Sequence, residues 1–254
     1  MHMDPNTSSF RITPYNAQHI GSREDQQDYF SFSDVFNNDE FYDIGVIAVI
    51  ADGMGGLENG RQASHIATNT FLDAYKANPE GLESIPERLV YSVHQANAAV
   101  QNLEGAGTTM CVAVVQDNFL HTLSVGDSRI YLYRNDTLTK INTEHKYENV
   151  LNERVIKGEI SLAAAINDPH ISALTSYVGI ARLEEIDLKE PIRLNQGDTI
   201  LLCTDGLYRA LTDDEIRFVI RDFRNDACEM LVDKAISKNL VNQDNTTAII
   251  LNID

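Results

Sequence analysis

Apolar residues in this chain fall into short runs, and the clearest of them ends in a carboxylate. Residues 46–51 are all β-branched or small and apolar, and Asp52, Gly53 and two further glycines follow closely. The run is too short for a typical helix and is closed by glycines, so it predicts a strand buried on both faces. Asp52 then lies where core meets surface, beside glycines that let backbone or ligand approach. Taken alone, this pattern fits either a metal or phosphate site or an ordinary Asp-Gly turn.

The periodicity of the remaining apolar positions predicts further helices and strands. Helical spacing predicts helices within residues 63–75, 89–103 and 227–235, and a capping box at Thr212 to Glu215 opens another. A period of two predicts strands at 108–115, 119–125 and 129–134, joined by tight turns at 117–118 and 126–128 into an antiparallel meander. Additional strands are expected at 10–16, 28–33, 41–51, 199–203 and 246–253.

Helices grouped between runs of hairpin-linked strands favour an α+β layered fold over alternating βαβ units, and a parallel sheet is not expected. Without a linker or long repeat, residues 10–254 are expected to form one domain, and the polar residues 1–9 a flexible N-terminus. The pattern weakens over residues 143–175, which we interpret as a mobile or inserted segment beside the core.

Composition narrows the possible partners and compartment. The 38 acidic against 20 basic residues give a formal net charge of -18, which argues against nucleic acid or an anionic membrane surface as the main partner. Three cysteines provide no disulfide framework, and no apolar run approaches the roughly 20 residues that span a bilayer. We therefore expect a cytoplasmic, monomeric protein without membrane association.

Five aspartates stand at predicted strand ends or turns, namely Asp28, Asp52, Asp127, Asp205 and Asp244. Oxygen ligands without a His or Cys cluster suit Mg²⁺ or Mn²⁺. Two such ions can share one carboxylate and hold a bridging water, whose hydroxide form attacks phosphorus. Arg23 is suited to hold the phosphate oxygens, because its planar guanidinium binds them in a bidentate way.

Six short motifs in order resemble the metal-dependent protein phosphatases of type 2C, in their bacterial form, over about residues 11–253. They are Gly21–Asp28 (GSREDQQD), Ala51–Gly56 (ADGMGG), Gly107–Thr109 (GTT), Val125–Arg129 (VGDSR), Cys203–Leu207 (CTDGL) and Gln243–Thr247 (QDNTT). A single Asp-Gly pair is weak evidence, whereas six ordered motifs over nearly the whole chain are specific.

The resemblance implies a four-layer αββα fold, in which two packed antiparallel sheets are flanked by helix pairs. It also implies that Asp52 bridges two Mn²⁺ or Mg²⁺ ions and that the Gly53 carbonyl binds one of them. Asp205 and Asp244 match ligands of the other ion, and Asp127 falls where many bacterial members hold a third, weaker ion.

The same resemblance implies roles for two further residues and for the whole protein. Arg23 matches the phosphate-binding arginine, and Asp28 matches an acid that orders metal-bound water. The implied reaction is one-step hydrolysis of phosphoserine or phosphothreonine in proteins, the products of a Ser/Thr kinase. Residues 143–175 match the variable flap near the cleft, which would influence substrate choice.

Several departures and alternatives accompany this interpretation. Gln27 stands where many members have an acid, and Met54 stands where animal members have a histidine proposed as general acid, so no proton donor is assigned. Structural alternatives are a surface ion pair for Arg23, a turn cap for Asp28 and a hairpin turn for Asp127. For His145 we favour a structural role.

Two functional alternatives also stay open. Gln27 is the one feature that favours a pseudo-phosphatase, a module that binds phosphoprotein without turnover. A phosphatase acting on small molecules would use the same site.

Overall fold

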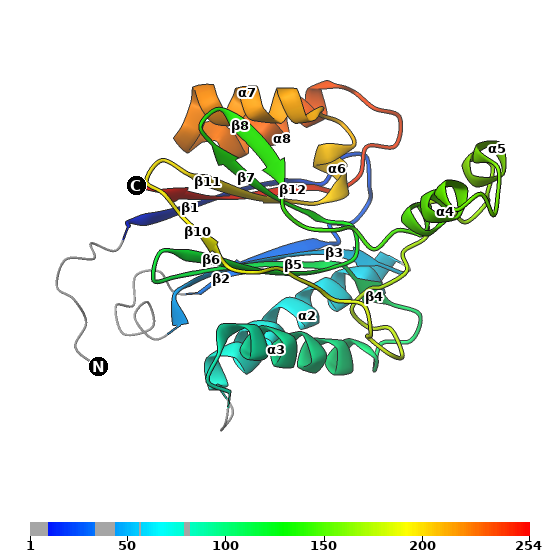
Figure 1. Ribbon diagram of the computed structural model, residues 1–254, viewed down its shortest axis with the longest axis horizontal. Coiled ribbons are helices and arrows are strands. Elements are labelled where there is room, and N and C mark those ends of the chain that lie inside the picture. The colour runs from blue at the N-terminus through cyan, green and yellow to red at the C-terminus, as the bar shows by residue number, and fades with distance from the viewer. Residues whose placement is uncertain (1–9, 34–43, 56, 79–81) are drawn as a thin grey trace.

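The computed structural model describes residues 10–33, 44–55, 57–78 and 82–254. Two sheets pack face to face, and a pair of helices covers the outer face of each (Figure 1). Helices α2 (Leu57–Ala77) and α3 (Ile85–Val100) cover one sheet, and α7 (Asp213–Phe223) and α8 (Ala227–Ser237) cover the other. The predicted α+β, four-layer architecture is therefore confirmed, with every strand pair antiparallel.

The first sheet has the strand order β1-β12-β11-β7-β8. Its strands are β1 (Ile12–His19), β7 (Arg129–Arg134), β8 (Thr137–Lys140), β11 (Thr199–Cys203) and β12 (Thr246–Ile253). The bounds of β7, β11 and β12 are those expected from the sequence, and β1 starts and ends later than expected. Strand β8 was not predicted, because it is a short, largely polar edge strand.

The second sheet has the order β10-β6-β5-β3-β2, with β4 paired to β3 and β9 to β6. Its strands are β2 (Asp28–Phe32), β3 (Val46–Met54), β4 (Gly107–Thr108), β5 (Met110–Gln116), β6 (Phe119–Val125), β9 (Asp187–Leu188) and β10 (Ile192–Arg193). Of the strand expected at 41–51, residues 41–43 lie outside the described residues, as do residues 1–9.

Strand β3 is buried on both faces, as its composition predicted. Ile47 and Val49 belong to the apolar cluster under α2 and α3, whereas Val46, Ala48 and Ile50 belong to the cluster between the two sheets. Alternation along a strand sends successive side chains to opposite faces, so one run of apolar residues joins two core layers. Asp52 is thus carried on a strand anchored from both sides.

The predicted meander is wrong at residues 126–128. Strand β6 pairs with β5, whereas β7 pairs with β11 and β8, so Gly126, Asp127 and Ser128 carry the chain from one sheet to the other. A period of two identifies strands but does not say which strand each one pairs with. Asp127 therefore lies at the junction of the two sheets, not in a hairpin.

Residues 143–175 contain two short helices, α4 (Tyr147–Ile156) and α5 (Leu162–Ile166), which project away from the four layers (Figure 1). A four-residue helix, α6 (Asp205–Tyr208), follows β11, and a 3-10 turn (Arg224–Asp226) separates α7 from α8. None of the helices in the described part of the chain is both long and apolar enough to cross a membrane.

Candidate metal and phosphate site

A cleft of about 410 Å³ opens at the end of β3, where the two sheets meet. Six of the seven residues predicted to form the site line it, namely Arg23, Asp52, Gly53, Asp127, Asp205 and Asp244, and Gly53 does so through its backbone alone. Asp28 lies beneath the cleft and does not line it. The other residues that line the cleft are Glu24, Asp25, Gln27, Met54, Gly55, Thr109, Ser172, Leu174, Arg209 and Asn245.

Two threonines fix the backbone of Asp52. The Asp52 N–H donates to Thr109 Oγ1 at 2.9 Å, and the Thr108 hydroxyl donates to the Asp52 carbonyl oxygen at 2.9 Å. The Thr109 N–H also donates to that carbonyl oxygen at 2.9 Å. The Gly107–Thr109 motif therefore holds the end of β3 and with it the direction of the Asp52 carboxylate.

Gly53 is required by close backbone packing. A Cβ atom at this position would lie 2.1 Å from the Gly60 carbonyl oxygen and 2.8 Å from that of Gln27. The Gly53 N–H donates to the Gln27 carbonyl oxygen at 3.1 Å. These contacts explain the glycine by packing alone and leave its predicted role as a carbonyl ligand a prediction.

Asp28 is buried in β2 and does not cap a turn. Its Oδ2 accepts hydrogen bonds from the Thr204 hydroxyl at 2.8 Å and the Thr247 hydroxyl at 2.6 Å, whereas its Oδ1 is buried without a hydrogen-bond partner. Burial raises the pKa of Asp28 to about 7, although the hydrogen bonds from Thr247 and Thr204 act to lower it.

Arg23 and Asp244 form an ion pair at the mouth of the cleft, with Nη2 2.7 Å from Oδ2. The pair depends on a turn at Gly21, which has φ +67 and whose absent Cβ would lie 2.4 Å from the Asp244 carbonyl oxygen. The Arg23 side chain is 53% exposed, so its guanidinium can reach a ligand in the cleft. Arg23 therefore does form an ion pair, as in the structural alternative. Its partner, however, is a predicted metal ligand, and both residues line the cleft.

Asp205 begins α6 and is nearly buried. Its Oδ2 accepts from Arg209 Nη2 at 2.9 Å, while its Oδ1 is buried without a hydrogen-bond partner. Gln243 connects this helix to the Asp244 loop, because its Nε2 donates to the Gly206 carbonyl oxygen at 2.9 Å. The two predicted ligands Asp205 and Asp244 are therefore held by neighbouring segments.

Asp127 has three polar neighbours. Its Oδ2 accepts from the Tyr208 hydroxyl at 3.0 Å and lies 3.3 Å from Lys146 Nζ and 3.9 Å from Arg209 Nη2. The turn that carries it is held by His145, whose Nδ1 accepts from the Gly126 N–H at 3.1 Å. This contact agrees with the structural role expected for His145.

The carboxylates raise one another's pKa values. Burial, followed by the charges of Asp28 and Asp205, raises the pKa of Asp52 well above its usual range. Burial also raises the pKa of Asp205 to about 6, against the opposing charge of Arg209. Crowded carboxylates of this kind carry more negative charge than their surroundings neutralise, which cations would relieve.

The donor set fits hard divalent ions. It consists of carboxylate and carbonyl oxygens, and two buried carboxylate oxygens, Asp28 Oδ1 and Asp205 Oδ1, have no hydrogen-bond partner. Among the described residues no three acidic, His or Cys side chains are yet gathered closely enough to enclose one ion. Arg23 on Asp244 and Arg209 on Asp205 account for this, since each occupies a carboxylate oxygen that an ion would use.

The sequence did not predict that the basic residues Lys146 and Arg209 and the hydroxyl of Tyr208 lie at the site. Arg209 stands four residues after Asp205, a spacing that brings side chains together only on a helix, and the four-residue α6 was not predicted. Nothing in the sequence around Lys146 indicated that it lies at the site, because the pattern of apolar residues is weak over residues 143–175. Ser172 and Leu174 of that segment also line the cleft.

Comparison with known proteins agrees with this geometry. The family model for protein phosphatase 2C matches residues 16–245. The serine/threonine phosphatase stp of Listeria innocua is 28% identical over 262 residues, which cover 99% of this chain and 95% of that protein.

Two solved structures share the fold. The PPM Ser-Thr phosphatase MsPP of Mycobacterium smegmatis, in complex with cacodylate, aligns with a TM-score of 0.75 and 26% identity over 97% of this chain and 100% of that one. The catalytic domain of PstP, in complex with two manganese ions, aligns with a TM-score of 0.73 and 23% identity over 96% and 99%. The chain therefore belongs to the protein phosphatase 2C family, in its bacterial form.

Proposed function

We propose that this protein hydrolyses phosphoserine and phosphothreonine in other proteins, using two divalent ions, Mn²⁺ or Mg²⁺. The observation that carries the proposal is the convergence of Asp52, Asp205 and Asp244 with Arg23 on one cleft. Membership of the family and the name of its Listeria relative support the reaction type. The two manganese ions of PstP, which has the same fold, support the choice of ion and the number.

In this proposal the Asp52 carboxylate would hold both ions, with Asp205 and Asp244 as further ligands for one of them and the Gly53 carbonyl oxygen for the other. Such ions, when bound, lower the pKa of a water molecule and offset the charge of the phosphate oxygens. Thr108 and Thr109 keep Asp52 pointed into the cleft, and Asp28 holds a polar floor beneath it through Thr204 and Thr247.

Arg23 binds the phosphate of the substrate. Its guanidinium, which contacts Asp244 at the mouth of the cleft, would face the phosphate oxygens as a bidentate donor when Asp244 serves as a metal ligand. Water attacks phosphorus, the bond from phosphorus to the serine or threonine oxygen breaks, and the side-chain alcohol leaves with a proton. No residue in the cleft is assigned as the donor of that proton.

A protein substrate is favoured because residues of the projecting segment 143–175 line the cleft. Ser172 and Leu174 of residues 143–175 stand at its edge, where side chains flanking a phosphorylated residue would lie. Residues 10–254 would then act as one phosphatase domain on substrates of a Ser/Thr kinase. A cytoplasmic location is proposed because Cys111, Cys203 and Cys228 are free thiols.

The cleft gives no support to a pseudo-phosphatase. Gln27, the feature that favoured one, has a neutral side chain, and its backbone carbonyl oxygen accepts from the Gly53 N–H at 3.1 Å and the Ser64 hydroxyl at 2.6 Å. Asp52, Asp205 and Asp244 line the same cleft, which supports turnover.

Phosphate release from a phosphothreonine peptide panel and from small phosphometabolites, with and without Mn²⁺, tests the proposal. We expect Mn²⁺-dependent release from the peptides with a higher kcat/KM than from any metabolite, and loss of it in Asp52→Ala. Release only from metabolites would reject the protein substrate. Mn²⁺-independent release, equal in Asp52→Ala, would reject the proposed site.

A further inference from the structure

Two basic side chains meet the carboxylates of Asp127 and Asp205. Arg209 Nη2 lies 2.9 Å from Asp205 Oδ2 and 3.9 Å from Asp127 Oδ2, and Lys146 Nζ lies 3.3 Å from the same Asp127 oxygen. Two carboxylates thus face two cations. Each acid of this pair has a cation beside it, whereas in the part of the chain that the structure describes the group of Asp28, Asp52 and Asp244 has one ion pair, between Arg23 and Asp244.

Lys146 is held firmly in this position. Its side chain is 13% exposed, and its ammonium also contacts the Tyr208 hydroxyl at 3.2 Å and Glu144 Oε1 at 3.4 Å. The Tyr208 ring lies 5.1 Å from Lys146 Nζ and stacks under the Arg129 guanidinium at 3.7 Å. Moving Lys146 away would therefore take its ammonium from three polar partners, Asp127, Tyr208 and Glu144.

Arg209 is the more exposed of the two basic residues. Its side chain is 54% exposed and it lines the cleft, so it can turn toward solvent when Asp205 binds an ion. Asp127 keeps Lys146 and Tyr208 in either case. A divalent ion placed between Asp127 and Asp205 would stand within a few ångströms of a fixed ammonium group.

We propose that Lys146, assisted by Arg209, takes the place of a third metal ion beside Asp127, so that this protein binds two divalent ions and not three. The inference rests on the proposed function, because it concerns the same cleft. Asp127 is then a positioning residue, which ties the turn between the two sheets to α6 and to the start of α4 through Tyr208 and Lys146.

The number of Mn²⁺ ions bound at saturation, measured by equilibrium dialysis, tests this inference without any assay of activity. We expect two ions for the wild type and three for the double variant Lys146→Gln, Arg209→Gln, in which the amides keep hydrogen-bonding capacity but the charges are gone. Adding Asp127→Asn to the double variant should return the number to two.

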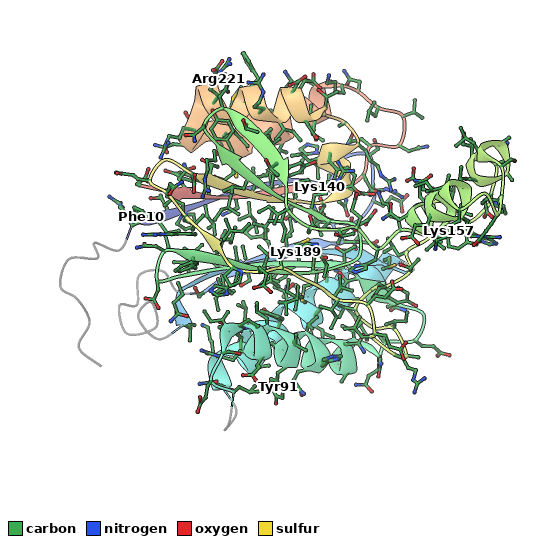
Figure 2. All side chains as sticks on the ribbon, viewed as in Figure 1. Phe10, Tyr91, Lys140, Lys157, Lys189 and Arg221 are labelled. Atoms are coloured by element: carbon green, nitrogen blue, oxygen red, sulfur yellow. The ribbon has the colours of Figure 1, made fainter. Side chains whose placement is uncertain are left out.

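A double variant with the same change in net charge controls for long-range attraction of cations. Lys157 lies on the projecting segment and Arg221 on the outer helix α7, both away from the cleft (Figure 2). Lys157→Gln with Arg221→Gln should bind two ions. Lys146→Gln alone, which removes the ammonium group but keeps hydrogen-bonding capacity, should add a weaker third ion and serves if the double variant does not fold.

Three ions in the wild type, or two ions in both the double variant and Lys146→Gln, would overturn the inference. Two ions in the wild type with three in the double variant would support it. A protein that binds no Mn²⁺ in any form would contradict the proposed metal site itself, which separates the two failures.

Discussion

Asp28 and Asp52 lie directly opposite each other on β2 and β3, so two carboxylates share one face of the sheet at the edge of the cleft. Like charges in this arrangement destabilise a sheet. Asp28 Oδ1 has no hydrogen-bond partner, and the charge of Asp28 contributes to the raised pKa of Asp52. When no cation is bound, the repulsion between these carboxylates therefore lowers the stability of the folded protein.

Asp28→Asn should stabilise the metal-free protein and weaken metal binding. The amide can donate to Asp52 and still accept from Thr204 and Thr247, so we expect a gain of about 1 kcal/mol, or about 2–4 °C in Tm, in the presence of a chelator. Loss of the carboxylate beneath the ligands should lower Mn²⁺ affinity about tenfold. Thermal unfolding and calorimetry measure the two effects, with Asp73→Asn in α2 as control. A less stable chelated protein with unchanged affinity would contradict this reasoning.

Mn²⁺ should raise the Tm of the wild type in a saturable way, because it binds the folded protein at the crowded carboxylates. At 100 times the dissociation constant, one site stabilises by about 2.7 kcal/mol. Asp205→Asn should lose most of this shift, whereas Asp222→Asn, at a surface position on α7, should retain it. Equal shifts in the two variants would show that Mn²⁺ binds elsewhere.

Thr109→Val should disturb Asp52 without touching any predicted ligand. It removes the acceptor of the Asp52 N–H and the partner of the Ser128 hydroxyl at 2.8 Å, at a cost of about 1–3 kcal/mol in the free energy of unfolding. We expect a lower kcat with little change in KM, measured with a phosphothreonine peptide. Thr109→Ser keeps the hydroxyl and should restore kcat; if it does not, the methyl packing of Thr109 matters more than its hydrogen bonds.

Glu144 should make the stability of the protein depend on pH in the acidic range. Burial acts to raise its pKa, but hydrogen bonds from Lys140 and Arg129 outweigh it and lower the pKa to about 2. A carboxyl whose folded-state pKa is depressed stabilises the protein above its unfolded value near 4.5, and this contribution is lost as pH falls toward 2.

Between pH 7 and pH 3 the contribution of Glu144 should fall by about 2 kcal/mol. Urea unfolding of the wild type and of Glu144→Gln at several pH values measures it, and the difference between the two proteins should shrink toward pH 3. A difference that stays constant with pH would show that Glu144 acts by packing alone.

The sequence predicted most of this fold because its strands are marked at both ends. Strand β11 holds the apolar run 200–203 and is followed by Asp205-Gly206, and strand β12 holds the apolar run 248–251 and is preceded by Gln243-Asp244-Asn245. The bounds of both strands were predicted correctly. The short edge strands β8, β9 and β10 have too few apolar residues to show a period. Which strands pair with β6 and with β7 depends on contacts between distant parts of the chain. The periodicity of apolar residues carries no information about those contacts.

The aspartates of the candidate site were predicted from the sequence, whereas the basic residues beside them were not. Aspartates at the ends of buried strands, such as Asp52 and Asp205, could be predicted as site residues from their positions. The ordered motifs predicted that these aspartates belong to one site. Arg209 and Lys146 meet Asp127 only through the packing of α6 and the start of α4 on the turn between the sheets. No local pattern in the sequence predicts that contact.

We propose that Asp52, Asp205 and Asp244 hold the ions needed to hydrolyse a phosphorylated protein. The initial rate of phosphate release from a phosphothreonine peptide in Mn²⁺ tests this in the wild type, Asp205→Asn and the surface control Asp222→Asn. We expect full activity in the control, loss of at least about 100-fold in Asp205→Asn, and no activity in any protein after chelation. Equal rates in Asp205→Asn and the wild type, or undiminished rates after chelation, would show that these carboxylates do not hold the ions of the reaction.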